Sequence, residues 1–305
     1  MNTLTTTFNG TEITPVLLNN YISYIDATPR TVDTYAKAIK QFYQYIEPRQ
    51  IKQPTRQDII DFREYLEQDH KASTVNLYII AIRQFFKWTE LNGIYPNIAD
   101  HVKGKKISRE PKKDYLAPNQ IKAILKSIDR TTINGIRDYA LISLMVTCGL
   151  RDIEVYRANI EDIRTMGTNT VLYVRGKGRD DKNEYVIIPT VVEQAIREYL
   201  KGRNATSTQP LFTSLSNHAN NERLTTRSIS RIVKTAFVKC GYDSERLTAH
   251  SLRHTAVTLA LQNGNSLQEV QQFARHTNIN TTMIYAHNLE KQNNKCSSTI
   301  ATELF

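Results

Sequence analysis

Apolar residues recur three or four positions apart in two stretches early in the chain, and this spacing predicts amphipathic helices. The stretches cover residues 32–46 and 75–86. Thr28 followed by Pro29 is typical of a helix start, because threonine caps free N–H groups and proline suits the first turn. Ser73 is placed to cap the second helix in the same way. The start of the chain is therefore predicted to be helical.

Weaker helical patterns accompany these stretches near residues 15–26 and 55–68. The four helices together predict a small bundle within residues 1–100. Its aromatic residues are more typical of a core than of a binding surface, because large apolar side chains are usually buried.

The pattern is more varied in the rest of the chain. A helix near residues 119–128 is followed by a strongly apolar one near 136–147, which Gly149 is placed to close. Residues 171–189 are apolar at both ends and rich in Gly, Asp and Asn between, which predicts a β-hairpin with Lys177 at or near its turn. Further helices are expected near residues 190–201, 225–240, 251–263, 266–275 and 279–287. The predicted fold class is mainly α: a helical bundle plus a mixed, mostly helical domain with a small antiparallel β-sheet.

Length and charge predict two domains. At 305 residues the chain is too long for one ordinary core. Residues 101–113 hold six basic side chains and one acidic one, together with a glycine and a proline, which favours a basic linker, although a solvated surface loop has the same pattern. We expect domains at 1–100 and 116–305, joined by a linker at 101–115.

The net charge of +10 favours a polyanionic partner, although many basic proteins never bind nucleic acid. Residues 1–100 carry ten Lys and Arg against eleven Asp and Glu, so the positive charge lies in the remainder of the chain. The candidate contacts to a polyanion are the linker lysines Lys103, Lys105, Lys106, Lys112 and Lys113.

Several classes of protein do not fit the sequence. No apolar run is long enough to span a bilayer, and the first residues lack the features of a secretory signal. Cys148, Cys240 and Cys296 are far apart and show no paired metal-ligand spacing. We expect a cytoplasmic chain with reduced cysteines and neither a disulfide nor a zinc site.

Two short segments contain candidate phosphate-binding groups. Arg151 and Glu154 lie three residues apart in TCGLRDIEV, a spacing that usually gives a surface pair. His250 and Arg253, in HSLRH, would share one helix face and could grip one anion, although such a pair is common in helices.

Two further segments contain candidate proton donors and nucleophiles. Lys177 lies between two glycines, as many ordinary turn lysines do. His276 and Tyr285 lie nine residues apart in ARHTNINTTMIYAH, where a lone tyrosine is more often structural than nucleophilic. Each of these motifs alone favours the structural interpretation.

The order of these residues along the chain resembles the tyrosine recombinase (phage integrase) family at its principal active-site positions. The ordered set is Arg151, Lys177, His250, Arg253, His276 and Tyr285. The N-terminal bundle resembles the SAM-like core-binding domain of that family, and residues 116–305 resemble its catalytic domain. One departure is Ala274 and Arg275, where the family usually has Leu and Gly before the histidine. It indicates an altered helix junction.

The residue types suit attack on a phosphodiester. Arg151 and Arg253 can stabilise charge on the nonbridging oxygens without a metal. Tyr285 has an ordinary pKa of about 10, so it needs a base or a positive field, and His250 is the candidate base. By resemblance, Lys177 is the general acid for the leaving 5′ oxygen.

The remaining polar residues near these positions are expected to have supporting roles. By resemblance, His276 hydrogen-bonds the transition-state phosphate. Glu154 is expected to support Arg151 or His250. His254 and His287 match no catalytic position and are assigned to structure or solvent.

The resemblance implies a site-specific recombinase that forms a 3′ phosphotyrosyl link and needs no cofactor. Its partner would be double-stranded DNA with paired half-sites, bound by a homotetramer in which two subunits are active at a time. Because few residues precede residue 14, an arm-binding domain is not expected, which favours simple integrases, Xer-like resolvases or invertases, including those of mobile elements. We expect the enzyme at the nucleoid, and accessory proteins are compatible with this interpretation.

Two alternatives remain open. A type IB topoisomerase uses nearly the same chemistry but relaxes DNA, and a DNA-binding regulator could keep the fold without cutting. The C-terminal tail is also open, because its apolar Ile300, Leu304 and Phe305 could pack on their own domain, fray, or, as the resemblance implies, dock into a neighbouring subunit.

Overall fold

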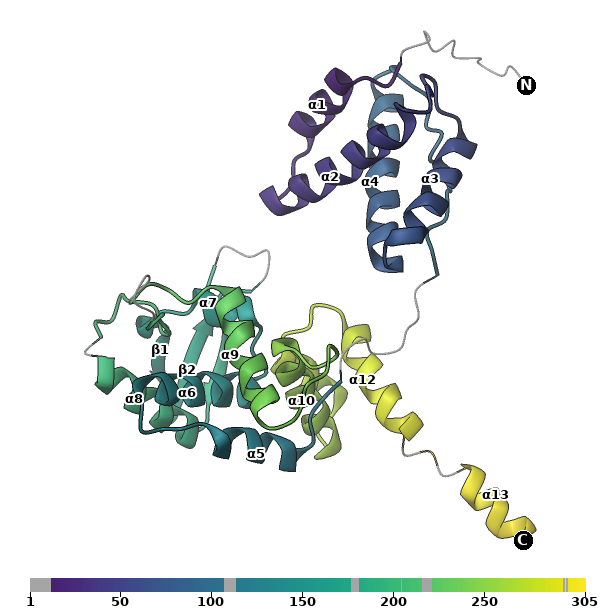
Figure 1. Ribbon diagram of the computed structural model, residues 1–305. Coiled ribbons are helices and arrows are strands. Elements are labelled where there is room, and N and C mark those ends of the chain that lie inside the picture. Colours follow the sequence, from purple (N-terminus) through teal and green to yellow (C-terminus); the bar gives the residue numbers. More distant parts are fainter. Residues whose placement is uncertain are drawn as a thin grey trace. The chain divides into compact units, whose positions relative to one another are not determined.

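The computed structural model describes residues 12–106, 114–176, 181–203, 205–215, 221–292, 294 and 296–305. The chain divides into two compact units, Met1–Glu110 and Pro111–Phe305 (Figure 1). The division falls inside the segment expected to be a linker. Each unit has its own hydrophobic core.

The N-terminal unit is a four-helix bundle, as predicted. Its helices are α1 (Pro15–Tyr24), α2 (Pro29–Ile46), α3 (Arg56–Asp69) and α4 (Ala72–Leu91). Thr28 caps α2 as expected, since its hydroxyl accepts a hydrogen bond from the backbone N–H of Thr31. The prediction for Ser73 is wrong: Lys71 is the N-cap residue of α4, and Ser73 lies inside the first turn.

Phenylalanine side chains fill the core of this bundle, which confirms the predicted burial for these aromatic residues. Phe42, Phe62, Phe85 and Phe86 are fully buried. The rings of Phe42 and Phe62 meet edge to face with centroids 5.1 Å apart, a favourable aromatic geometry. The bundle is thus held by apolar contacts between helices that are far apart in sequence.

The chain after α4 remains attached to the bundle as far as Lys106. Val102 is buried in the core of the bundle. The Asn76 side chain accepts from the backbone N–H of Lys105 at 2.6 Å and donates to its carbonyl oxygen at 2.8 Å. The first half of the basic segment is therefore ordered against α4.

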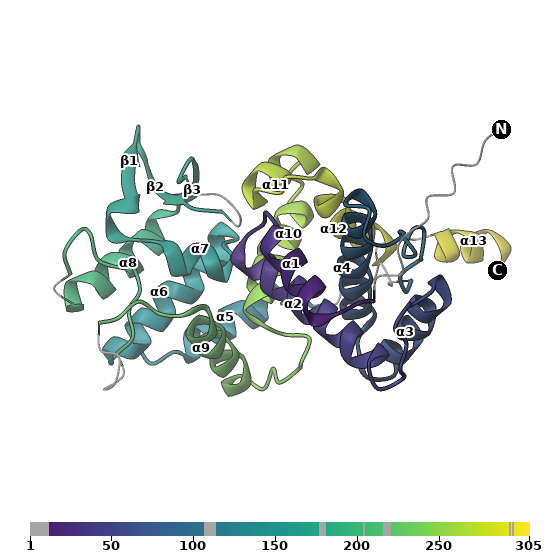
Figure 2. The same cartoon turned by 90° about the horizontal axis from the view of Figure 1, so that it is seen from above.

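The second unit is mostly helical, and a small antiparallel sheet lies beside its helices (Figure 2). Its elements are α5 (Pro118–Ser127), α6 (Ile133–Cys148), α7 (Asp152–Arg157), the 3-10 helix η1 (Ile160–Asp162), β1 (Ile163–Met166), β2 (Asn169–Val174), β3 (Glu184–Ile188), α8 (Thr190–Arg203), α9 (Thr226–Lys239), α10 (Ala249–Gln262), α11 (Leu267–Ala274), α12 (Ile279–Gln292) and α13 (Cys296–Leu304). The predicted fold class is confirmed.

The sheet has the order β1-β2-β3, with both pairs antiparallel. The predicted hairpin is β2 and β3, and β1 is an additional strand whose pattern was too short to recognise. In the register, Leu172 pairs with Ile163 on one side and Val186 on the other. The inward residues of β2 and β3 face the helical core.

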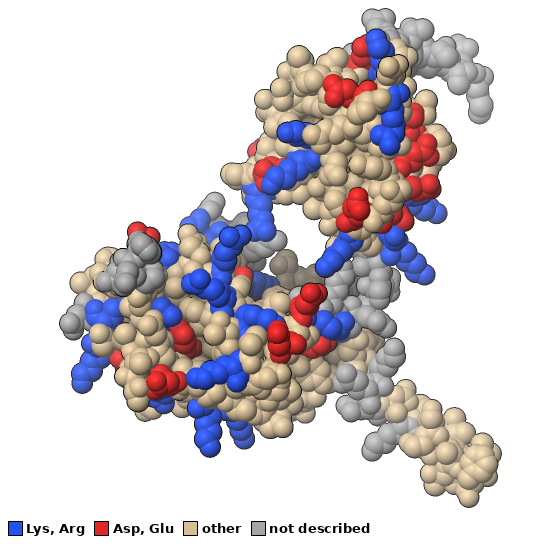
Figure 3. Space-filling model, in the orientation of Figure 1, with Lys and Arg blue, Asp and Glu red and all other residues tan. Residues whose placement is uncertain are grey.

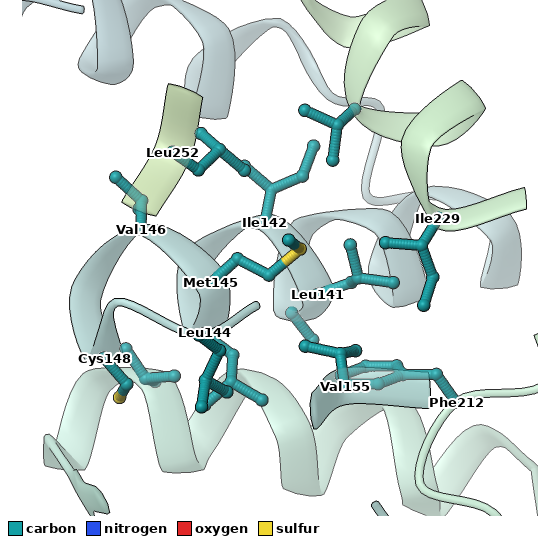
Figure 4. Packing of buried hydrophobic residues seen from close by; sticks show 14 of the residues in the cluster. Leu141, Ile142, Leu144, Met145, Val146, Cys148, Val155, Phe212, Ile229 and Leu252 are labelled. Carbon is teal, nitrogen blue, oxygen red and sulfur yellow. The ribbon is translucent and has the colours of Figure 1, made fainter. Parts of the chain in front are cut away.

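Helix α6 lies at the centre of this unit. It packs against α8, α9, α10 and β3. Its apolar residues point in several directions toward these neighbours (Figure 4). Leu141, Leu144 and Met145 are fully buried. A helix that is apolar on all faces is a core helix, and this one fixes the loop that follows it.

Gly149 closes α6 as predicted, and its conformation is left-handed, with φ 59° and ψ 32°. A Cβ atom at this position would also lie 3.0 Å from the ring of Phe273. The turn at Gly149 therefore requires glycine for two reasons, and it leads directly into Arg151.

The last helix, α13, was not predicted. None of its residues is buried. Throughout the described ranges, the helices are too short or too polar to cross a membrane. The three cysteines are free thiols, Cys148 buried and Cys296 exposed.

Candidate active site

Helix α10 positions the residues predicted at His250 and Arg253. Thr248 and Ser251 form a capping box at its start. Arg253 lies one turn further along and is almost fully buried. Its guanidinium donates to the carbonyl oxygen of Gly149 at 2.6 Å and also to that of Ala274. Arg253 thus connects the ends of α6 and α11, two helices whose last carbonyls lack partners within the helix.

Arg151 and Glu154 are not an ordinary surface pair. The Arg151 backbone N–H donates to Glu154 Oε2, and its guanidinium donates to Oε1, both at 2.8 Å. The side chain of Glu154 is fully buried, whereas that of Arg151 remains 27% exposed. The carboxylate therefore fixes Arg151 at the start of α7 while leaving part of its guanidinium accessible to an anion.

A third arginine joins this group. The Arg275 guanidinium donates to Glu154 Oε2 at 2.8 Å, and its side chain is only 4% exposed. Arg275 occupies the C-cap of α11 with φ 53° and ψ 46°. This is the left-handed conformation that glycine adopts most easily. The backbone at this junction thus has the conformation expected for the glycine that is usual in the family. At Arg275 the difference from the family pattern is the added side chain.

His276 and Tyr285 come together although they lie in different segments. His276 is buried after α11, and its Nδ1 is 2.9 Å from the Thr282 hydroxyl on α12. Tyr285, also on α12, is half-buried. The rings of His276 and Tyr285 are nearly parallel, at 22°, with centroids 6.2 Å apart.

His254 also contacts Tyr285, with ring centroids 4.8 Å apart. On its other side it lies 5.2 Å from the ring of His250, which is exposed. The assignment of His254 to structure or solvent is therefore too narrow, because the ring lies within the site. The signal in the sequence was its position four residues after His250, on the same helix face.

Burial and positive charge set the protonation of these groups. Burial and the charge of Arg253 lower the pKa of His276 to about 4, and burial and the neighbouring His250 lower that of His254 to about 4. Burial raises the pKa of Tyr285, although Arg253 and Arg151 oppose that rise. At neutral pH the site thus contains a neutral phenol and two neutral imidazoles in a positive field.

Arg253 and Glu154 both have lowered pKa values. Burial and the charge of Arg151 lower the pKa of Arg253 to about 9, with Glu154 opposing, so the guanidinium is still protonated at neutral pH. Burial alone would raise the pKa of Glu154, but the charges of Arg275 and Arg151 more than offset it, so the pKa is lowered. Three guanidinium groups around one carboxylate leave a net positive site suited to a phosphate.

Lys177 lies outside the described residues. The described residues on either side of it are held by α7 and η1. Arg157 donates to the carbonyl oxygen of Gly176 at 2.8 Å. Lys182 contacts the buried carboxylate of Asp162 at 2.6 Å. Gly176 and Lys182 are therefore both attached to the segment that begins at Arg151.

The linker lysines are divided between described and undescribed residues. Lys103, Lys105 and Lys106 are all exposed, and the Lys105 ammonium pairs with Glu67 at 2.8 Å. Lys112 and Lys113 lie outside the described residues. On the face of the second unit shown in Figure 3, Lys and Arg are more numerous than Asp and Glu. Within the described part of the chain, no cluster of three or more His, Cys, Asp or Glu is arranged to hold a metal ion.

Both units match known protein families. Residues 114–292 match the phage integrase family, and residues 18–93 match the phage integrase N-terminal SAM-like domain. The chain therefore belongs to the phage integrase family.

Named relatives agree with this membership. Tyrosine recombinase XerC of Chlamydia trachomatis serovar L2 is 30% identical over 225 residues, which cover 73% of this chain and 70% of that protein. A tyrosine recombinase of Pseudothermotoga lettingae is 27% identical over 286 residues, covering 90% of this chain and 95% of the relative. This chain is an enzyme of the same type, acting in site-specific DNA recombination.

Solved structures share the fold. XerH site-specific recombinase bound to a palindromic difH substrate, in a post-cleavage complex, aligns with a TM-score of 0.75 at 22% identity, covering 89% of this chain and 80% of that chain. A lambda integrase dimer bound to a COC′ core site aligns with a TM-score of 0.69 at 17% identity, covering 90% of this chain and 78% of that chain. Both proteins were solved with DNA.

Proposed function

We propose that this enzyme cuts and rejoins DNA through a covalent 3′ phosphotyrosyl link to Tyr285. The observation that carries the proposal is the convergence of Arg151, Arg253 and His276 on Tyr285 across three helices and the turn after α11. An isolated tyrosine would not be surrounded by two arginines and a buried histidine. The names of the relatives support the same reaction class.

In the proposed first step, the Tyr285 oxygen attacks the scissile phosphorus and the 5′ oxygen leaves. Arg151 and Arg253 bind the nonbridging oxygens, where negative charge develops. His250 takes the phenol proton, directly or through a water molecule. The phosphodiester energy is kept in the new P–O bond, so religation needs no external energy source.

His276 and Lys177 complete the proposed step. If Thr282 donates to Nδ1 of His276, the ring carries its proton on Nε2 and can donate to the phosphate. Lys177 supplies a proton to the departing 5′ oxygen. Glu154 acts on Arg151 through the contacts described above and touches no substrate atom.

Strand exchange follows when a 5′ hydroxyl from a second duplex attacks the phosphotyrosine. We propose that this takes place in a homotetramer on paired half-sites, with two subunits active at a time. The exposed Lys103 and Lys106, together with Lys105, Lys112 and Lys113, contact the DNA backbone in this proposal, so affinity should fall with salt. The two domains of residues 1–100 and 116–305, joined by the linker, would both bind the duplex.

A supercoiled plasmid with two target sites tests the proposal against its alternatives. A recombinase yields exchanged or deleted circles. A type IB topoisomerase yields relaxed circles without exchange, and a non-cutting DNA-binding protein leaves the plasmid unchanged. Relaxation without exchange, or no reaction with sites that the protein demonstrably binds, would contradict the proposal.

A further inference from the structure

Arg275 occupies a position where a glycine would be the simpler choice. Its φ of 53° is in the left-handed region, which costs a side chain conformational energy. The guanidinium nevertheless lies in the interior, at the meeting point of α6, α7 and α11. A residue that tolerates an unfavourable backbone and a buried charge must make compensating contacts.

Those contacts involve acceptors at the ends of α6 and α11 and on α7. Arg275 Nη1 donates to the Phe273 carbonyl at 2.9 Å, and Nη2 donates to the carboxylate of Glu154 at 2.8 Å. Nη2 also lies 3.4 Å from the Gly149 carbonyl oxygen, which accepts from Arg253 at 2.6 Å. The side chain therefore connects the acceptors that hold Arg253 and Arg151.

Glu154 is the link to Arg151. Its Oε2 accepts from Arg275 and from the Arg151 backbone, and its Oε1 accepts from the Arg151 guanidinium. Both carboxylate oxygens are occupied, so the orientation of the carboxylate depends on both arginines. Removing Arg275 would leave the buried carboxylate with two of these three hydrogen bonds.

We infer that Arg275 is a positioning residue for the phosphate-binding Arg151, acting through the carboxylate of Glu154. The inference rests on the proposed function, because it assigns Arg151 to the scissile phosphate. Arg275 itself touches no substrate in this account. It keeps Glu154 ionised and oriented, and Glu154 in turn fixes the Arg151 guanidinium before DNA binds.

The charges around Glu154 make the effect of Arg275 on the cleavage rate dependent on pH. The charged groups that face the carboxylate are Arg151 at the start of α7, Arg253 from α10 and Arg275 after α11. Burial favours the protonated carboxyl, and the charge of Arg275 is the largest influence opposing it. The nearby Cys148 thiol has its pKa raised by burial to about 12, so it stays neutral in the assay range.

The test uses the whole 305-residue chain and a nicked DNA substrate that traps the covalent complex. Arg275→Gly removes the side chain and suits the left-handed backbone. We expect covalent complex formation to slow about 10- to 100-fold, with half-site affinity within about twofold of the unchanged enzyme. Arg275→Lys keeps a positive charge without the planar fork and should recover part of the rate.

The defect of Arg275→Gly should be largest near the acidic end of the assay range and should shrink as the pH rises. Without Arg275 the carboxyl of Glu154 is protonated more easily, and raising the pH restores its bonds to Arg151. In a Glu154→Gln background, Arg275→Gly should add no pH-dependent loss. Arg197→Gln, which removes the 70% exposed arginine of an ion pair with Glu193 on α8, is the control and should leave the rate unchanged.

Three results separate the possibilities. No covalent complex with the unchanged enzyme would contradict the proposed function itself. A normal rate and pH profile for Arg275→Gly, with the unchanged enzyme active, would overturn only the role of Arg275. The third result is a loss of rate in Arg275→Gly that does not depend on pH, is not relieved in Arg275→Lys and persists in the Glu154→Gln background. It would show a purely structural role for Arg275 and would also overturn the inference.

Discussion

The imidazole of His276 faces the phenol ring of Tyr285 with an angle of 22° between the ring planes. The orientation of His276 is set by Thr282, which is three residues before Tyr285 on α12. A displacement of α12 would therefore change the position of the tyrosine and the orientation of the histidine together. In the proposed reaction, α12 therefore positions both the nucleophile and the histidine that donates a hydrogen bond to the phosphate.

The proposed role of Lys177 as a general acid supplies the first prediction. A general acid matters in proportion to how much the leaving group needs a proton. Lys177→Ala should slow cleavage of ordinary DNA strongly, whereas a substrate with sulfur in place of the bridging 5′ oxygen should regain much of the rate. Cleavage rates of both substrates provide the measurement. Equal defects on the two substrates would assign Lys177 to DNA binding.

The turn at Gly149 predicts a change in stability. Gly149→Ala places a side chain in a left-handed conformation and against Phe273, which should lower the free energy of unfolding by about 2–4 kcal/mol. Gly241→Ala is the matched control: its φ is 81°, but the added Cβ meets no atom within 4 Å, so only about 1–2 kcal/mol should be lost.

Urea unfolding followed by circular dichroism measures both variants. Trp88 is the only tryptophan and lies in the N-terminal unit, so its fluorescence reports the unfolding of that unit. The urea midpoint measured by this fluorescence is the internal control and should be the same in both variants and the unchanged enzyme. Equal losses of unfolding free energy in the two variants would show that Phe273 moves aside and that its contact with the added Cβ does not destabilise the fold.

The buried carboxylate of Glu154 predicts a dependence of stability on pH. Its pKa in the folded enzyme lies below the ordinary value of 4.5, because the charges of Arg275 and Arg151 outweigh burial. Its contribution is therefore fully present above that ordinary value and is lost as the pH falls through the lower, folded value. Glu154→Gln should be less stable than the unchanged enzyme at neutral pH, and the difference should narrow in acid. A difference in unfolding free energy that stays constant down to strongly acidic pH would show that Glu154 is not ionised in the folded enzyme.

The periodicity of the sequence was enough to predict the larger helices and the β2–β3 hairpin. Strong apolar repeats determine which face of a long helix is buried, so α2, α4 and α6 could be recognised. Short elements carry too few repeats, which is why α7 and β1 were missed. The start of α4 was misassigned because Lys71 supplies no side-chain cap and Ser73 is the nearest residue with a capping side chain.

The site could be predicted as residue types but not as contacts. The order of Arg151, Arg253 and Tyr285 indicated the chemistry through a family resemblance. The roles of His254 and Arg275 depend on which helix ends meet, and that is a property of tertiary packing. Arg275 was visible only as a departure from the family pattern, since sequence spacing cannot show that its side chain reaches Glu154.

The exposed C-terminal helix predicts a role in assembly. No residue of α13 is buried, and Ile300 and Leu304 are 55% and 69% exposed. Apolar side chains of this kind gain stability when a partner covers them. Truncation after Lys295 should preserve binding to a single half-site but weaken cooperative filling of the second and slow recombination. Gel-shift titration on single and paired half-sites measures this, and unchanged cooperativity would refute docking of the tail into a neighbouring subunit.

Covalent attachment of Tyr285 to DNA can be detected by mass spectrometry of the protein–DNA complex trapped on a nicked target site. A 3′-phosphodeoxynucleotide adduct is expected on the peptide that contains Tyr285. Tyr285→Phe should abolish the adduct while binding the site almost as tightly, since the hydroxyl contributes little to phosphate affinity. An adduct on another residue, or normal cleavage by Tyr285→Phe, would show that Tyr285 is not the nucleophile.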